Sequence, residues 1–125
     1  MKTPILFFAI VALASAAPRT VSLTGTLTNT TGDVTAPAHL DITQDGEKLS
    51  ARLVTSPPLT GTGTLAGRCL EGWCELSGSL DGGFTVKFRG VLSAREFRGT
   101  YLVRPGQGQT QYGRFDFSPA APVSK

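Results

Sequence analysis

The sequence is poor in the side chains that most often bind metals or transfer protons, and this scarcity limits its chemistry. Among 125 residues there are one histidine and two cysteines. A structural zinc site usually takes four cysteine or histidine ligands, and a calcium loop needs clustered acidic side chains; the sequence provides neither. The glycines of Gly106-Gln107-Gly108 lack the strand-turn-helix context of a phosphate-binding loop. We therefore predict no bound metal and no cofactor.

The single histidine gives little support for catalysis. His39 lies two residues from Asp41, so the two side chains would share one face of a strand, where a carboxylate could orient an imidazole. Serine and threonine are plentiful, but none stands in a recognisable nucleophile motif. A surface histidine is the simpler interpretation, and we predict that the protein is not an enzyme.

Long hydrophobic runs are missing beyond the first residues. The one such run, Pro4–Leu13, follows a lysine and precedes Ala14 and Ala16 at the spacing of a signal-peptidase site. The run is shorter than the about 20 residues of a membrane-spanning helix. We predict that residues 1–16 are a signal peptide and that the mature chain has no transmembrane segment. The product would be secreted or held in the periplasm or cell envelope.

Helical periodicity is also missing after residue 17, where eight segments alternate between apolar and polar side chains. Alternation with a period of two places one set of side chains on the inner face of a sheet, which is typical of half-buried β-strands. Most breaks between the segments are short, and Asp45-Gly46 is a strong hairpin signal. The segments are residues 20–29, 39–44, 48–53, 59–65, 74–80, 84–92, 97–104 and 112–117.

Short connections favour antiparallel neighbours that follow one another in the chain. We therefore predict an all-β fold, an eight-stranded antiparallel meander closed into a small up-and-down β-barrel, with a β-sandwich as the alternative. Residues 17–125 would form this single domain, with a short flexible C-terminal tail from about residue 119. The predicted architecture resembles that of lipocalins and avidins in strand number. The first strand lacks the Gly-x-Trp of lipocalins, and the several tryptophans of an avidin site are missing, so we assign no family.

Two sets of inward-facing residues make opposite predictions for the barrel interior. Aromatic side chains favour a filled core, whereas glycines leave space, and eight strands enclose just enough room for side chains or one small molecule. The sequence therefore does not decide between a packed barrel and a hollow one. The inward aromatic residues are Phe84, Phe88, Phe97, Tyr101, Phe115 and Phe117, and the inward glycines are Gly25, Gly61, Gly63, Gly78, Gly90, Gly99 and Gly113.

The two cysteines, Cys69 and Cys74, bracket four residues between two predicted strands. Export favours disulfides, and a four-residue hairpin loop can hold its flanking residues within bridging distance. We predict a disulfide and not a redox pair, because the spacing differs from that of Cys-x-x-Cys motifs. Trp73 lies in this loop, where we interpret it as a cap on one barrel end, with an exposed binding anchor as the alternative.

Charge is distributed unevenly along the chain. Residues 17–83 contain four basic and seven acidic side chains, whereas residues 84–114 contain six basic and one acidic. The alternation places most of these cations on the outer face of three consecutive strands about 5 Å apart, so they would form one patch. The planar guanidinium group suits carboxylate, sulfate or phosphate. The predicted binding residues are Lys87, Arg89, Arg98, Arg104, Tyr112 and Arg114, together with Trp73.

These features favour a secreted, noncatalytic binding module. Its partner would be an anionic polysaccharide, a cell-envelope polymer or an acidic protein surface, bound through the basic face. Export and the lack of a recognition motif argue against nucleic acid. One alternative is a small-molecule-binding barrel that uses its interior. Another is an exported hydrolase inhibitor that inserts the Cys69–Cys74 segment or the mature N-terminus into a cleft.

Overall fold

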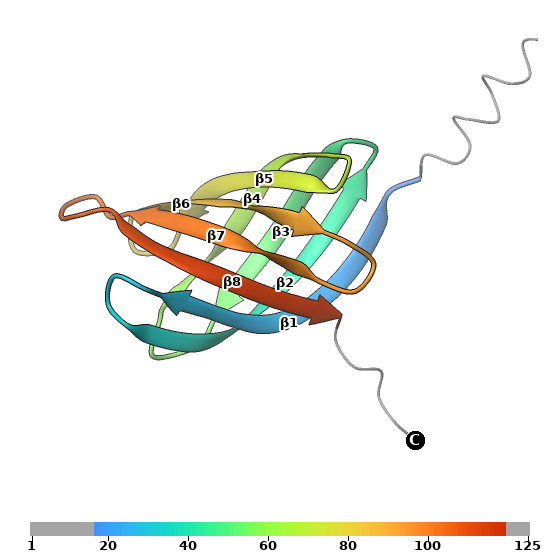
Figure 1. The fold of residues 1–125 in the computed structure, drawn as a ribbon. Coiled ribbons are helices and arrows are strands. Elements are labelled where there is room, and N and C mark those ends of the chain that lie inside the picture. The colour runs from blue at the N-terminus through green and yellow to red at the C-terminus, as the bar shows by residue number, and fades with distance from the viewer. Residues whose placement is uncertain (1–16, 120–125) are drawn as a thin grey trace, which may run out of the picture.

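The computed structural model describes residues 17–119, which form eight strands and no helix (Figure 1). The predicted signal peptide, residues 1–16, and the predicted tail beyond residue 119 lie outside the described residues. The strands are β1 (Arg19–Asn29), β2 (Val34–Asp45), β3 (Lys48–Thr55), β4 (Gly61–Leu70), β5 (Trp73–Leu80), β6 (Phe84–Leu92), β7 (Phe97–Arg104) and β8 (Gln111–Pro119).

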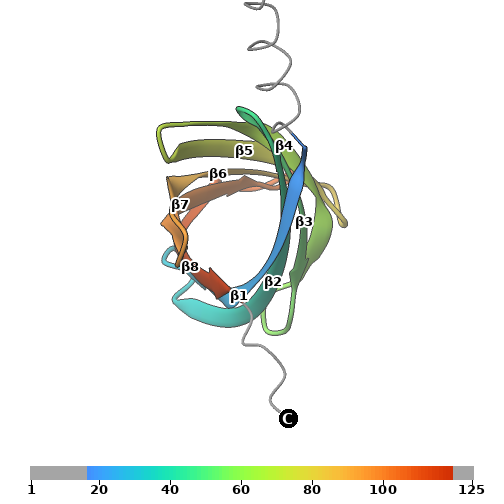
Figure 2. The same cartoon turned by 90° about the vertical axis from the view of Figure 1, so that its right-hand side faces the viewer.

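The strands close into a barrel in which every strand is antiparallel to both neighbours (Figure 2). Each strand pairs with the next in the chain, and β8 returns to pair with β1 from Leu23↔Pro119 to Asn29↔Gly113. Closure leaves no unpaired edge strand, which protects an all-strand protein from edge-to-edge association. The predicted up-and-down barrel is confirmed, and the sandwich alternative is not.

Two strands, β2 and β4, differ most in extent from the prediction, whereas each of the others differs by at most three residues. β2 begins at Val34 and runs through Pro37, where the sequence suggested a break. Pro37 lies in the part of β2 that pairs with β1 alone, since pairing with β3 begins at Ala38, so its missing N–H costs no ladder bond toward β3. β4 starts two residues later than predicted and continues to Leu70. The segment before β4 is instead a separate loop, residues 56–60.

Aromatic side chains fill the middle of the barrel. Phe88, Phe97 and Phe117 are fully buried, and Phe115 lies among them with ring centroids 4.7 Å from Phe97 and 4.9 Å from Phe88. Glycine makes the room for this layer, because a Cβ atom at Gly90 would lie 2.9 Å from the Phe115 ring and 2.2 Å from a backbone oxygen. Gly90 and the aromatic residues are therefore parts of one packing arrangement, whereas Gly25 and Gly99 allow the backbones of neighbouring strands to approach closely.

The barrel has two ends, and the connections between strands differ from one end to the other. At one end, here called the open end, β1 begins, β8 finishes, and the turns at residues 46–47, 71–72 and 93–96 join strand pairs. At the other, the capped end, the loop of residues 56–60 brings Leu59 against the core. None of the residues from 17 to 119 belongs to a helix that is long and apolar enough to cross a membrane.

Candidate functional site

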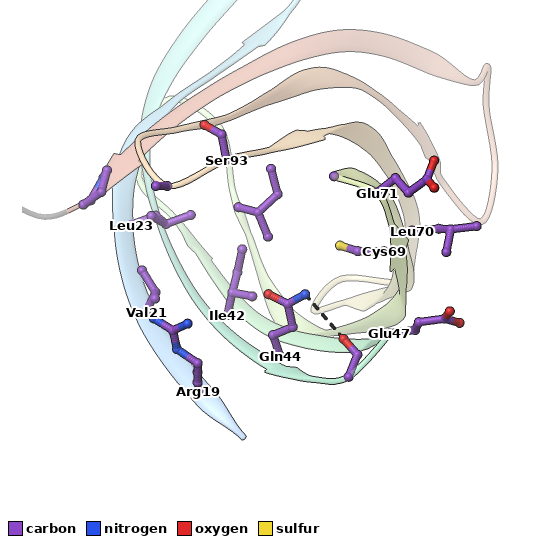
Figure 3. Close-up of a pocket in the computed structure, with 15 residues that line it drawn as sticks. Arg19, Val21, Leu23, Ile42, Gln44, Glu47, Cys69, Leu70, Glu71 and Ser93 are labelled. Atoms are coloured by element: carbon purple, nitrogen blue, oxygen red, sulfur yellow. Dashed lines mark hydrogen bonds between the residues drawn. The ribbon is translucent and has the colours of Figure 1, made fainter. Parts of the chain in front are cut away.

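A cavity of about 590 Å³ occupies the open end of the barrel (Figure 3). Its floor consists of apolar side chains that are almost fully buried: Leu23, Ile42 and Cys69 are only 2%, 3% and 6% exposed. Ile42 and Gln44 point into the opening in Figure 3, whereas Leu70 points away from it. The strand alternation explains this arrangement, because inward positions of β1, β2 and β4 meet at this end. The lining also includes Val21, Leu92, Ser93, Ala94 and Pro119.

The rim of the cavity carries charge of both signs. Arg19, Glu47 and Glu71 line its edge, and Arg68 holds Glu47 through a hydrogen bond of 3.0 Å. The Gln44 amide lies at the same level and donates to the backbone oxygen of Gly46 at 3.4 Å. An apolar floor under a polar rim suits a ligand with an apolar body and a polar head.

A disulfide between Cys69 and Cys74 fixes one wall of the cavity and confirms the predicted bridge. The predicted four-residue loop is wrong, because Leu70 and Trp73 also pair, which leaves a two-residue turn, Glu71-Gly72. Both turn residues have positive φ, 54° and 85°, as in the type I′ turn that matches strand twist. The Gly72 carbonyl accepts a hydrogen bond of 2.8 Å from the amide of Leu92, so the turn is fastened to the end of β6.

Trp73 does not cap the barrel, which corrects the preferred interpretation of the sequence. It is 49% exposed on the outer face of β5, between Leu70 at 62% and Val91 at 52%. The physical reason is alternation: Cys74 faces inward and is fully buried, so its neighbour must face outward. The alternation of β5 was visible in the sequence and was sufficient to place this side chain.

The predicted basic face lies on the outside of the barrel, but acidic side chains neutralise part of it. Arg89 Nε lies 3.3 Å from a carboxylate oxygen of Glu75, which the register places opposite it on β5. Arg98 lies 3.6 Å from Asp116 and 3.7 Å from Glu96. The six residues predicted for this face lie outside the core: Lys87, Arg89, Arg98, Arg104, Tyr112 and Arg114.

Three cations of that face, Lys87, Arg104 and Arg114, form no ion pair with any described residue. Lys87 and Arg104 line a hollow of about 370 Å³ on the outer surface of β5, β6 and β7. Hydroxyl groups beside two cations are donors that suit an anion. The other polar residues that line the hollow are Ser77, Ser79 and Thr85.

His39 and Asp41 form the contact expected from their spacing, with Nε2 2.9 Å from Oδ1. The Ser22 hydroxyl donates to the same carboxylate at 2.6 Å, and this hydrogen bond is the main reason that the pKa of Asp41 is lowered. The serine thus contacts the carboxylate, whereas a serine nucleophile would need to contact the imidazole. In the described part of the chain, no three histidine, cysteine or acidic side chains converge on a metal position.

Comparison of the chain with protein-family models, curated proteins and solved structures found no match.

Proposed function

We propose that the protein is a noncatalytic binding protein that holds a small amphipathic ligand in the open end of its barrel. The observation that carries this proposal is the cavity of about 590 Å³ with an apolar floor. Ligand pockets have volumes of about 300–1,000 Å³ and combine apolar walls with a few polar groups. The disulfide suits an oxidising compartment, so we place this binding outside the cytoplasm, after export.

The rim indicates how such a ligand would be oriented. Its apolar part packs against Leu23, Ile42 and Leu92, and its polar head stays level with Arg19 and Glu71. Because the rim offers both a cation and a carboxylate, a head group with a charge or several hydrogen-bonding atoms finds a partner there. The ligand stays accessible at the rim, which suits reversible uptake and release.

Filling the cavity tests the proposal directly. Val21 lines the cavity and is 43% exposed, so Val21→Trp adds bulk to the cavity with little effect on the core. We expect this change to weaken binding of 1-anilinonaphthalene-8-sulfonate, an amphipathic fluorescent probe, by at least about tenfold. Thr20→Trp is the matched control, since Thr20 faces outward on the same strand. Unchanged binding by Val21→Trp, or no binding by the unaltered protein, would refute the proposal.

The hollow with Lys87 and Arg104 supports a second candidate function, binding of an anionic polymer on the outer face. These two cations have no acidic partner among residues 17–119, so their charge is available to a ligand, unlike that of Arg89 and Arg98. The partner would be a sulfated or carboxylated polysaccharide, an envelope polymer or an acidic protein. The hydrolase-inhibitor alternative stays a prediction, and the two-residue turn between Leu70 and Trp73 offers it no long projecting loop.

Heparin is a suitable probe for this second candidate. We expect the double change Lys87→Gln and Arg104→Gln to lower retention on immobilised heparin and to reduce its salt dependence. The matched control is Lys48→Gln with Arg52→Gln, two exposed cations on β3. Equal loss in both double variants would show that only net charge matters and would remove the hollow as a site.

A further inference from the structure

A second, smaller cavity lies inside the capped end of the barrel. Its volume is about 200 Å³, and it shares no lining residue with the cavity at the open end. The loop of residues 56–60 contributes Pro58, Leu59 and Thr60 to its wall. The remaining residues that line it are Leu27, Asn29, Leu53, Thr55, Leu80, Phe84, Val86, Phe88, Tyr101, Val103 and Gln111.

Asn29 fixes the polar corner of this cavity. It is 8% exposed and is the only buried polar or charged side chain in the described part of the chain. Its Oδ1 accepts a hydrogen bond of 2.8 Å from the Gly32 amide, so the other amide atom must be the nitrogen. That Nδ2 donates to Oε1 of Gln111. The orientation of Gln111 is therefore determined, and no described residue accepts a hydrogen bond from its Nε2.

Tyr101 lines the same cavity and supplies a second donor. Its side chain is 6% exposed and stacks on Phe88 with ring centroids 5.5 Å apart. A Cβ atom at position 113 would clash with the tyrosine ring, so Gly113 leaves room for the ring beside β8. Burial raises the pKa of Tyr101 to about 12, so the hydroxyl keeps its proton at neutral pH. No described side chain or backbone group forms a hydrogen bond with that hydroxyl.

We propose that the capped end binds a small cyclic or aromatic molecule carrying one hydrogen-bond acceptor, such as an aryl ketone. Its ring packs against Phe84 and Phe88, and its acceptor oxygen receives hydrogen bonds from Tyr101 Oη and Gln111 Nε2. The size fits, because an engineered apolar cavity of about 150 Å³ holds benzene. Tyr101 Oη and Gln111 Nε2 have no acceptor among the described residues and stay accessible to solvent, so a ligand that brings an acceptor would take the place of water at these donors. This site is independent of the cavity at the open end.

Acetophenone and ethylbenzene form a probe pair that isolates the acceptor. They have nearly the same shape, but only acetophenone has a carbonyl oxygen. We expect the unaltered protein to bind acetophenone at least about fivefold more tightly than ethylbenzene, as measured by NMR titration, because one hydrogen bond accounts for that ratio. Equal affinity for the two probes, or no binding of either, would overturn the proposal.

Variants then assign the donors. Tyr101→Phe keeps the ring and removes the hydroxyl, so we expect it to weaken acetophenone binding by about fivefold and to leave ethylbenzene binding unchanged. Gln111→Glu, which keeps the acceptor for Asn29 but loses Nε2 as a donor, should act in the same direction. Tyr112→Phe is the control, since Tyr112 is exposed on the outer face. If Tyr101→Phe binds acetophenone as tightly as the unaltered protein does, the hydroxyl has no such role and the proposal fails.

The open-end variant separates this site from the proposed function. Val21→Trp should leave acetophenone binding intact, because Val21 lines only the open-end cavity and the two cavities share no lining residue. Loss of acetophenone binding in Val21→Trp would place the probe at the open end and overturn the assignment to the capped end.

Discussion

The two ends of the barrel are built from the same eight strands, yet they differ in their connections and in the size of their cavities. At the open end, two of the strand pairs are joined by two-residue turns, 46–47 and 71–72, which add nothing that could fold over the barrel. At the capped end, the loop of residues 56–60 is long enough to fold inward and place Leu59 against the core. Loop length thus distinguishes the two ends, although both cavities are open to solvent.

The difference between the ends extends to their chemistry. The open end has a wide cavity with Arg19 and Glu71 at its rim, whereas the capped end has a small cavity with Tyr101 and Gln111 inside it. Charged groups line the wider cavity, where water solvates them, because burial of an unpaired charge is costly. The smaller cavity is lined by neutral donors and by no charged side chain.

Removing the aromatic layer should break the distinction between the ends and have the largest effect. Phe115→Ala deletes the ring that packs between Phe88 and Phe97, and we expect a loss of about 3–5 kcal/mol in the free energy of unfolding. Urea denaturation measures this loss. Tyr112→Ala on the same strand is the control, and its outer position should limit the change to about 0.5 kcal/mol. Similar losses in both variants would show that the layer does not hold the barrel together.

Alkaline pH should weaken the capped end selectively. Burial raises the pKa of Tyr101 from 10.0 to about 12 in the folded protein. Between these values the unfolded chain loses the proton first, so stability falls as pH rises above about 10, by about 1 kcal/mol because solvent still screens the partly accessible hydroxyl. Below pH 10 both states are protonated and no effect is expected.

The Tyr112→Phe variant makes this titration measurable, because Tyr101 is then the only tyrosine of the chain. Absorbance at 295 nm follows its ionisation, and denaturation at several pH values follows stability. A titration midpoint near the ordinary tyrosine value would contradict the burial of this hydroxyl. In Tyr101→Phe, the loss of stability in this pH range should shrink.

Breaking the disulfide should loosen the open end alone. Cys69→Ala with Cys74→Ala removes a bridge that closes a very short loop, so we expect a loss of about 2 kcal/mol in the free energy of unfolding. Amide hydrogen exchange should quicken at the turn of residues 71–72 and at the end of β6, where the Leu92 amide donates to Gly72. Amides near Asn29, at the capped end, are the internal control. Equal acceleration at both ends would mean that the bridge stabilises the whole barrel.

Strand alternation made most of the barrel predictable from the sequence. It placed the core faces of β3, β6 and β8 correctly, and the Asp45-Gly46 pair located a hairpin that the structure confirms. Alternation along β5 also indicates that Trp73 points outward. The interpretation of Trp73 as a cap on the barrel end was wrong because the Cys69–Cys74 segment was treated as a loop. Alternation assigns side chains to a face but does not show how far a strand continues into a turn.

The two cavities could not be predicted because they depend on which connection folds over an end. Nothing in Ser56-Pro57-Pro58 alone shows that Leu59 would turn inward. The partial neutralisation of the basic face depended on register, since Glu75 opposes Arg89 only once β5 and β6 are aligned. Register is a long-range property, and period-two patterns in separate segments leave it undetermined.

The smallest expected effect compares one strained turn residue at each end. Glu71 at the open end and Asp33 at the capped end both have positive φ, 54° and 58°, a conformation that disfavours most side chains other than glycine. Asparagine and aspartate tolerate it better than glutamate does, so Glu71→Asn should raise the free energy of unfolding by about 0.5–1 kcal/mol. Asp33→Asn replaces one tolerant residue by another and should change it by less than about 0.3 kcal/mol.

Denaturation of both variants under identical conditions tests this difference. Glu71→Asn creates an Asn-Gly pair with Gly72, the preferred sequence for the type I′ turn that closes the β4–β5 hairpin, so the gain belongs to the open end. Equal stabilisation in the two variants would mean that both turns relax in the same way. In that case, strain would not distinguish the open end from the capped one, and loop length alone would account for their difference.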